Sequence, residues 1–150
     1  MFSLSDSDNY AQIVERIQQL KPGTKPLWGT MNVSQMMLHC QMSFKIAFEE
    51  LEMQTGLLGF LFGKMAKKQM IKNKPFRKNL PTAPLFKTSH INPDFETTKT
   101  QLLNYINRFK LAGSEGITQK PHPFFGKMTF KEWDTLQYKH LDHHLKQFGV

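Results

Sequence analysis

Three of the six histidines stand within five positions near the carboxyl end, in "YKHLDHHLKQFGV". His140 and His144 have i, i+4 spacing, which puts two imidazoles one turn apart on the same side of a helix. Neutral imidazole nitrogens bind divalent transition metals, so this pair could hold an ion. The pair could also be hydrogen-bonded core histidines, because an HxxxH spacing arises by chance as well.

The phase of the surrounding helix places this pair among apolar residues. On a wheel drawn at about 100° per residue, His140 and His144 fall within the apolar arc of segment 130–148 and are expected to face the interior. His143 falls at the edge of the arc and is expected to contact water. The opposite side carries Lys131, Lys139, Asp142 and Lys146. A buried polar group without a partner costs about 1–3 kcal/mol, so two buried imidazoles need either a metal or hydrogen bonds.

A third histidine could complete the site. His39, in "MMLHCQM", lies at the margin of another apolar stripe, and alone it is most simply a core or boundary residue. Together with the pair, it makes a three-histidine set across two facing helices, which is how bundle metal sites are built. Three neutral imidazoles leave a divalent charge uncompensated and a coordination position open, as in catalytic sites. His90 and His122 stand in proline-containing connections and are expected not to be ligands.

Acid–base helpers are scarce near this set. Asp142 lies on the far side of its helix, and Glu49 and Glu50 lie about 15 Å along the axis from the second-helix histidine. Gln35, one turn before that histidine, is a candidate to orient a bound water, and Tyr138 is a weaker candidate. This shortage argues against a hydrolase with its own carboxylate base. It leaves room for a reaction that needs no carboxylate base, or for no catalysis.

The elements that must position these residues are four predicted helices. The first spans 6–20 and is capped by Ser5 or Ser7. The second opens at Asn32, where Gln35 completes a capping box. The third begins with Asn92 as its cap and Pro93 in its first turn, and Gly113 ends it. The fourth opens with the box formed by Thr129 and Glu132.

A long connection separates the second and third of these helices. Residues 65–73 are predicted to form a short helix, and 75–93 an extended stretch. No segment alternates with period two over more than a few residues, so strands are not expected. The sequence therefore predicts an all-α fold, an antiparallel four-helix bundle with a long crossover between helices two and three, as a single domain over residues 1–150.

The net charge of +8 is concentrated in one segment. Residues 64–78, "KMAKKQMIKNKPFRK", carry seven Lys or Arg and no acid, whereas the rest of the chain is nearly neutral. This run is either a solvated surface or the contact of a non-catalytic helical module with an anionic membrane or nucleic acid. No nucleic-acid motif accompanies it, so nucleic acid is not the expected partner.

Other features bound the class of protein. Cys40 is the single cysteine, which excludes an internal disulfide and fits a reducing, cytoplasmic setting. The amino terminus lacks the features of a secretory signal, and no run of about 18 apolar residues predicts a membrane span. Trp28, Phe124 and Phe125 precede the two histidine-bearing helices and form either an apolar pocket mouth or a plug.

The histidines and their flanks resemble the DinB/YfiT-like superfamily of four-helix-bundle metalloproteins. The resemblance rests on "WGTMNVSQMMLHC" and "KHLDHHLKQF", and it covers nearly the whole chain. The run "HPFFGKMTFKEWDTLQYKHLDHHLKQFGV" is similar to a branch described only as a domain of unknown function. The resemblance implies a Ni²⁺, Zn²⁺ or Fe²⁺ ion held by His39, His140 and His144, and often a homodimer. It also implies a small-molecule substrate with a low-molecular-weight thiol as cosubstrate, in a metal-dependent S-transferase or hydrolase.

Overall fold

All regular structure in the described part of the chain is helical. The computed structural model describes residues 2–52, 57–78 and 86–150, and for residues 57–60 only the backbone. These ranges contain five α-helices and no strand: α1 (Ser7–Gln19), α2 (Val33–Ala47), α3 (Leu57–Met70), α4 (Phe95–Ala112) and α5 (Phe130–Gln147). The one β pairing within them is an isolated bridge between His122 and Gly126. The all-α prediction is therefore confirmed.

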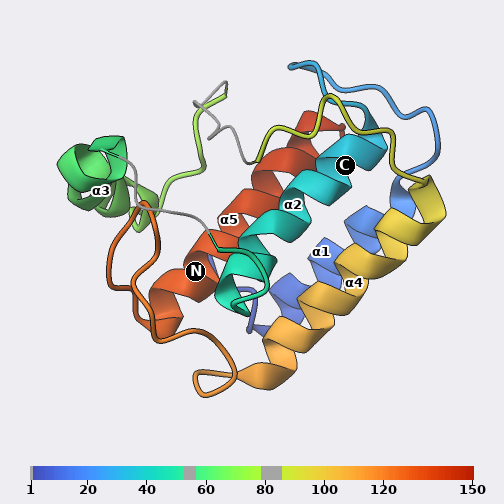
Figure 1. Ribbon diagram of the computed structural model, residues 1–150. Helices are drawn as coiled ribbons and strands as arrows, with labels where there is room; N and C mark the ends of the chain where they lie inside the picture. Colours follow the sequence, from blue (N-terminus) through green and yellow to red (C-terminus); the bar gives the residue numbers. More distant parts are fainter. Residues whose placement is uncertain (1, 53–56, 79–85) are drawn as a thin grey trace.

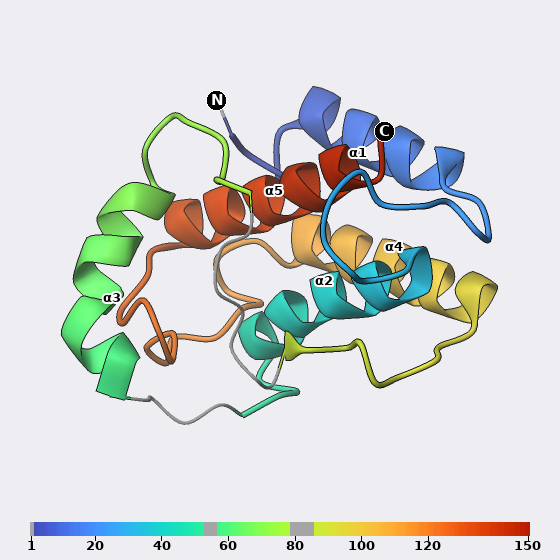
Figure 2. The ribbon, with the colours of Figure 1, turned by 90° about the horizontal axis from the view of Figure 1, so that it is seen from above.

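Four of the helices pack together, and α3 lies apart from them (Figure 1). Helix α2 packs against both α4 and α5, and α1 packs against α5. The colour gradients of Figure 2 show α1 and α5 running in one direction and α2 and α4 in the other. Within the described residues, no helix is long and apolar enough to cross a membrane.

Two of the predicted helix starts are confirmed in detail. The Asn32 side chain accepts a hydrogen bond from the Gln35 amide at 2.9 Å, and the Gln35 side chain accepts from the Asn32 amide at 2.9 Å. Thr129 and Glu132 form the same reciprocal box at the start of α5. Each box satisfies backbone donors that a helix start leaves without partners. The two histidine-bearing helices thus begin at positions that the sequence specifies.

The other starts differ from the prediction. Asp6, and neither Ser5 nor Ser7, caps α1 by accepting from the Asn9 amide at 3.0 Å. Asp94, and not Asn92, caps α4, so Pro93 lies outside the helix.

The crossover also differs from the prediction. Helix α3 starts at Leu57 and ends at Met70, and is longer than the short helix expected at 65–73. The described residues of the 75–93 stretch contain no α-helix or strand, and 79–85 lie outside the described residues.

The core lies among α1, α2, α4 and α5. Eleven of the 15 residues of α2 are buried, which confirms that this helix is covered on most sides. The largest fully buried side chains include Trp133, Phe44 and Phe109. Burying such side chains stabilises the fold by about 1.5–3 kcal/mol each relative to exposure. This packing holds α2 and α5 side by side, which is what the histidines require.

The expected solvent face of α5 is in part covered. Lys139 is 2% exposed and Asp142 is 6% exposed, although both were predicted on the side away from the core. Arg16 of α1 binds the Asp142 carboxylate at 2.9 Å. The Lys139 ammonium donates to the carbonyl of Met70 at the end of α3. The prediction was wrong because α1 and the end of α3 cover this side of α5 (Figure 2).

Candidate metal centre

Three imidazoles from α2 and α5 meet between the two helices. His39 and His144 are buried and His140 is half-buried. The Nε2 atoms of His39 and His140 are 2.9 Å apart. The three histidines each offer one ring nitrogen, and no two of these atoms are more than 4.8 Å apart. The two predicted helix faces therefore bring the three predicted residues to one point.

The distance between two of the three nitrogens fits a small divalent ion. Zinc–nitrogen bonds are about 2.0–2.1 Å long. Two such bonds set their nitrogens about 2.9 Å apart at a right angle and about 3.4 Å apart at the tetrahedral angle. The observed separation of 2.9 Å between His39 and His140 matches the lower value. The three ligand atoms all lie within 4.8 Å of one another, so the cluster could hold a metal ion once the more distant nitrogens move closer together.

Hydrogen bonds outside the cluster orient two of the rings. His39 Nδ1 lies 2.8 Å from the carbonyl oxygen of Phe86, and His144 Nδ1 lies 2.8 Å from Oε1 of Gln147. Gln147 Nε2 donates to the Trp28 carbonyl at 2.6 Å, which turns its oxygen toward His144. Both Nδ1 atoms must therefore donate, which leaves the Nε2 lone pairs free. Such outer partners are typical of metal-binding histidines.

Gly29 allows Gln147 to take this position. Its φ is +81°, and a Cβ atom built there would lie 2.5 Å from Gln147 Nε2. A glycine is needed both for the backbone conformation and for the close approach. Gln147 was not among the predicted site residues. Its i, i+3 spacing from His144 is the sequence signal that could have found it.

Burial keeps the three imidazoles neutral. It lowers the pKa of His144 to about 3, with a smaller contribution from His39. Burial lowers the pKa of His39 against the opposing effect of the Phe86 carbonyl. The pKa of His140 lies well below its ordinary value, through burial first and the neighbouring histidines second. Because neutral imidazole is the form that binds metals, the cluster is in its binding-competent protonation state at pH 7.

The chain matches a known family over almost its full length. The family described as "Protein of unknown function (DUF1569)" matches residues 4–149. The chain belongs to the DUF1569 family. No curated protein and no solved structure matches it. The DUF1569 match names no wider superfamily, so the DinB/YfiT-like resemblance stays a prediction.

The remaining candidate residues of this DUF1569 chain have other contacts. The Gln35 side chain, besides its role in the capping box, donates to the carbonyls of Ser89 and Ile91 at 3.0 and 2.9 Å. Its amide therefore serves the helix start and the adjoining loop. Tyr138 is half-buried, and its ring lies 5.7 Å from that of Phe2. Burial raises the pKa of its hydroxyl.

The other histidines lie outside the cluster. His90 is exposed, and His122 is buried in the turn before α5. His143 is half-buried, and its ring lies 5.9 Å from that of Trp28 and 6.2 Å from that of Phe76. Trp28 therefore lies beside the cluster, whereas Phe124 and Phe125 belong to the His122 turn.

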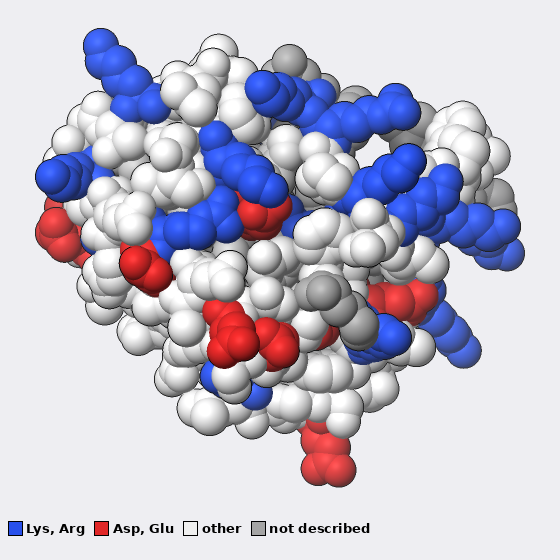
Figure 3. Space-filling model, turned by 180° about the vertical axis from the view of Figure 1, so that it is seen from behind, with Lys and Arg blue, Asp and Glu red and all other residues white. Residues whose placement is uncertain are grey.

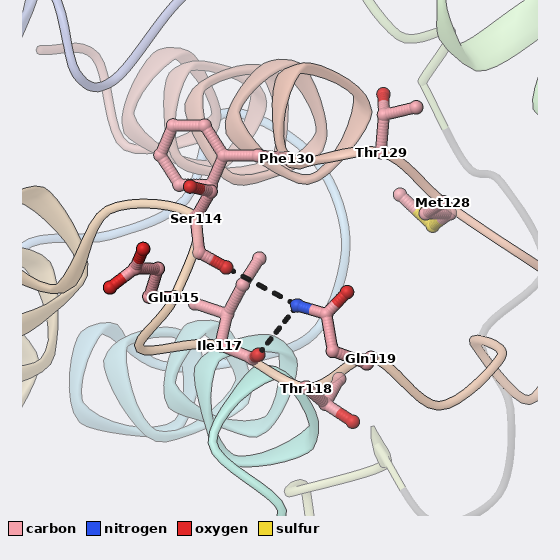
Figure 4. Close-up of a pocket in the computed structure, with 8 residues that line it drawn as sticks. All are labelled: Ser114, Glu115, Ile117, Thr118, Gln119, Met128, Thr129 and Phe130. Carbon is pink, nitrogen blue, oxygen red and sulfur yellow. Dashed lines mark hydrogen bonds between the residues drawn. The ribbon is translucent and has the colours of Figure 1, made fainter.

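A hollow of about 480 Å³ lies elsewhere, between loop 114–119 and the start of α5 (Figure 4). The Gln119 amide spans it and donates to the carbonyls of Ser114 and Ile117 at 3.2 and 3.3 Å. Its α5 boundary is Phe130, ten residues before His140 and so about 15 Å away along the helix. This hollow is therefore separate from the histidine cluster.

Proposed function

We propose that this DUF1569 chain binds a divalent metal ion through His39, His140 and His144. The observation that carries the proposal is the convergence of three neutral imidazoles from α2 and α5, with nitrogens no more than 4.8 Å apart. The hydrogen bonds to Phe86 and Gln147 support it, because they point the Nε2 atoms of two rings into the cluster.

We further propose that α1, α2, α4 and α5 form the antiparallel four-helix bundle of the DinB/YfiT-like superfamily, as a single domain. The packing of α2 on α5, which run in opposite directions (Figure 2), supports this arrangement, and the contacts of α2 with α4 and of α1 with α5 complete the set of four. The crossover between α2 and α4 then carries α3. In this arrangement the two ligand-bearing helices are adjacent and antiparallel, as inward-facing bundle sites require.

The chemistry proposed for the site is that of a metal- and thiol-dependent transferase or hydrolase of small molecules. A bound Ni²⁺, Zn²⁺ or Fe²⁺ ion would polarise a substrate oxygen or favour the thiolate form of a bound thiol. The thiol must come from outside, because Cys40 is fully buried within the core. Two acidic residues that lie away from the cluster are ion-paired with arginines, Asp142 with Arg16 and Glu50 with Arg108.

Metal analysis of matched variants tests the binding proposal. The chain purified without chelators should carry about one divalent ion, and His140→Ala should lose it. His143→Ala is the matched control, because His143 neighbours the cluster on the same helix but is not part of it. Adding Ni²⁺ or Zn²⁺ at about 100 times its Kd to the chelated protein should raise the free energy of unfolding by about 2.7 kcal/mol.

Two results would contradict metal binding. In the first, the wild-type chain carries no bound ion and its Tm does not rise when metal is added. The other is an equal metal response in His140→Ala and wild type. Either result would favour histidines that are only hydrogen-bonded core residues. If metal binding holds, turnover of electrophilic small molecules with low-molecular-weight thiols then tests the reaction class, again with His140→Ala as the inactive reference.

A further inference from the structure

Helix α3 is held to the rest of the molecule by one side. Gly63 is buried against the 122–126 turn, where a Cβ atom would collide with the carbonyl oxygen of Phe124. Lys67 donates to the carbonyl of Lys127 and pairs with Glu132 of α5 at 2.9 Å. These contacts fix which side of α3 faces inward.

The end of α3 is fixed as well. The buried Lys139 ammonium donates to the carbonyls of Met70 and Lys72 at 2.5 and 3.1 Å. A cation at this position satisfies carbonyls that a helix end leaves without partners. Met70 itself is 3% exposed. The orientation of α3 is therefore determined at its middle and at its end.

The outward side of α3 is apolar. Leu61, Phe62 and Met65 are 59%, 48% and 61% exposed. At about 100° per residue these three side chains span about 100° of the helix, and Gly63 lies about 150° from their centre. The same contacts that bury Gly63 therefore turn three large apolar side chains toward solvent. Ile71, just beyond the helix, is a fourth exposed apolar residue, at 46%.

Two cations flank one edge of this apolar side. Lys64 and Lys68 are exposed on α3, and they belong to the 64–78 run of seven Lys or Arg without an acid. Among described carboxylates, only Glu132 pairs with a member of this run, Lys67. Figure 3 shows Lys and Arg side chains gathered over the side of the molecule where α3 lies. A partner for this surface must therefore offer negative charge for the lysines and an apolar environment for the three exposed side chains.

We propose that α3 docks on an anionic phospholipid surface. Leu61, Phe62 and Met65 enter the boundary between headgroups and acyl chains, while Lys64 and Lys68 contact anionic headgroups. This is the arrangement of an interfacial amphipathic helix, which lies in the membrane plane and does not span it. It agrees with the absence of a membrane-crossing helix among the described residues.

Nucleic acid fits the surface less well. Single-stranded nucleic acids are held by cations together with aromatic rings on which bases stack. The exposed apolar side of α3 offers one such ring, Phe62, beside the aliphatic Leu61 and Met65, which gain nothing from phosphates. A lipid surface accounts for all three apolar side chains and for the lysines.

Vesicle cosedimentation of the full chain tests the proposal. Vesicles of phosphatidylcholine alone are compared with vesicles containing about 30% phosphatidylserine, at low and high salt. The chain should bind the anionic vesicles and detach as salt rises. The variant Lys64→Gln/Lys68→Gln should bind them about 25-fold more weakly, because each lysine near such a surface contributes about fivefold. Lys21→Gln/Lys25→Gln, an exposed pair in the α1–α2 loop, is the matched control.

The apolar contribution is tested separately. The triple variant Leu61→Gln/Phe62→Gln/Met65→Gln should lose more than tenfold in vesicle binding. The control is Leu111→Gln, because Leu111 on α4 is 76% exposed but lies outside the basic run. Circular dichroism verifies that each variant retains its helices. His140→Ala should bind vesicles like wild type, which separates this proposal from the metal proposal.

Several outcomes would overturn membrane docking. One is the absence of binding to anionic vesicles, and a second is binding that the triple apolar substitution leaves unchanged. A third is tighter, salt-dependent binding to a DNA or RNA oligonucleotide than to the vesicles. This last result would assign the basic run to nucleic acid instead.

Discussion

The His122 turn makes stability depend on pH through a group outside the histidine cluster. His122 is 6% exposed, and its Nδ1 accepts hydrogen bonds from the amides of Phe124 and Phe125 at 3.0 and 3.2 Å. Its ring also lies 5.1 Å from that of Trp133. A protonated imidazole has no acceptor nitrogen, so the turn requires the neutral ring. Burial lowers the pKa of His122 to about 4.

The size of the effect follows from linkage. With an unfolded pKa near 6.5 and a folded pKa of about 4, the unfolded state binds more protons between these two values. Stability therefore falls as pH drops through this window, at about 1.4 kcal/mol per pH unit. Above pH 6.5 both states are neutral and the term vanishes. Between pH 7.5 and pH 5 the loss due to this one group is about 2 kcal/mol.

His122→Asn isolates this term. An asparagine oxygen can accept from the amides that follow it, as in an Asx turn, but it does not titrate. Urea unfolding with a chelator present, at pH 7.5 and pH 5, gives the free energy of unfolding of both proteins. The other buried histidines contribute equally to the pH dependence of stability in wild type and variant. The variant should lose about 2 kcal/mol less than wild type on acidification. Losses that agree within about 0.5 kcal/mol would refute the reasoning, because His122 would then not be held neutral by the fold.

Three further predictions concern positioning and reactivity. Gly29→Ala should lower the free energy of unfolding by about 1–2 kcal/mol more than Gly23→Ala. Both glycines have φ near +80°, but only a Cβ at position 29 would collide with Gln147. Urea unfolding of the two variants measures this difference. Asp134→Ala should lower the free energy of unfolding by about 2–4 kcal/mol, because the Asp134 carboxylate accepts four hydrogen bonds from residues 3–5. A loss under about 1 kcal/mol in urea unfolding would contradict this role. Cys40 should resist disulfide reagents at pH 8 until urea unfolds the chain, because burial raises the pKa of its thiol. Fast labelling of Cys40 in the native chain would contradict its burial in the core.

The sequence predicted those parts of the fold that depend on local pattern. Apolar periodicity located α1, α2, α4 and α5, and the boxes at Asn32 and Thr129 fixed two helix starts. The predicted cap of α1 was wrong because of a contact with a residue far away in the sequence. The Ser5 hydroxyl is bound to Asp134, 129 residues away, which leaves Asp6 as the cap. A choice among neighbouring polar residues is thus made by a partner that local sequence does not reveal.

Charge pattern was a poor guide where helices cover one another. A wheel places Lys139 and Asp142 opposite the apolar arc, which predicts contact with solvent, but a charge can be buried when paired. Asp142 is paired with Arg16, and Lys139 is bound by helix-end carbonyls of α3. Neither partner can be inferred from the periodicity of α5. The glycines at 59 and 63 weakened the pattern of α3, although Gly63 is what lets α3 approach the His122 turn.

The histidine cluster shows the same division between local and tertiary information. Spacing and phase identified the pair His140 and His144, and the resemblance added His39, but the tautomer of His39 depends on a distant carbonyl. Since the Phe86 carbonyl fixes His39 as an Nδ1 donor, its Nε2 can only accept, and His140 must donate across the 2.9 Å contact while no ion is bound. Binding a metal through Nε2 would then require His140 to shift its proton from Nε2 to Nδ1, whereas His39 and His144 already carry their protons on Nδ1. His140 is therefore the one member of the set whose tautomer must change, while burial keeps all three rings neutral.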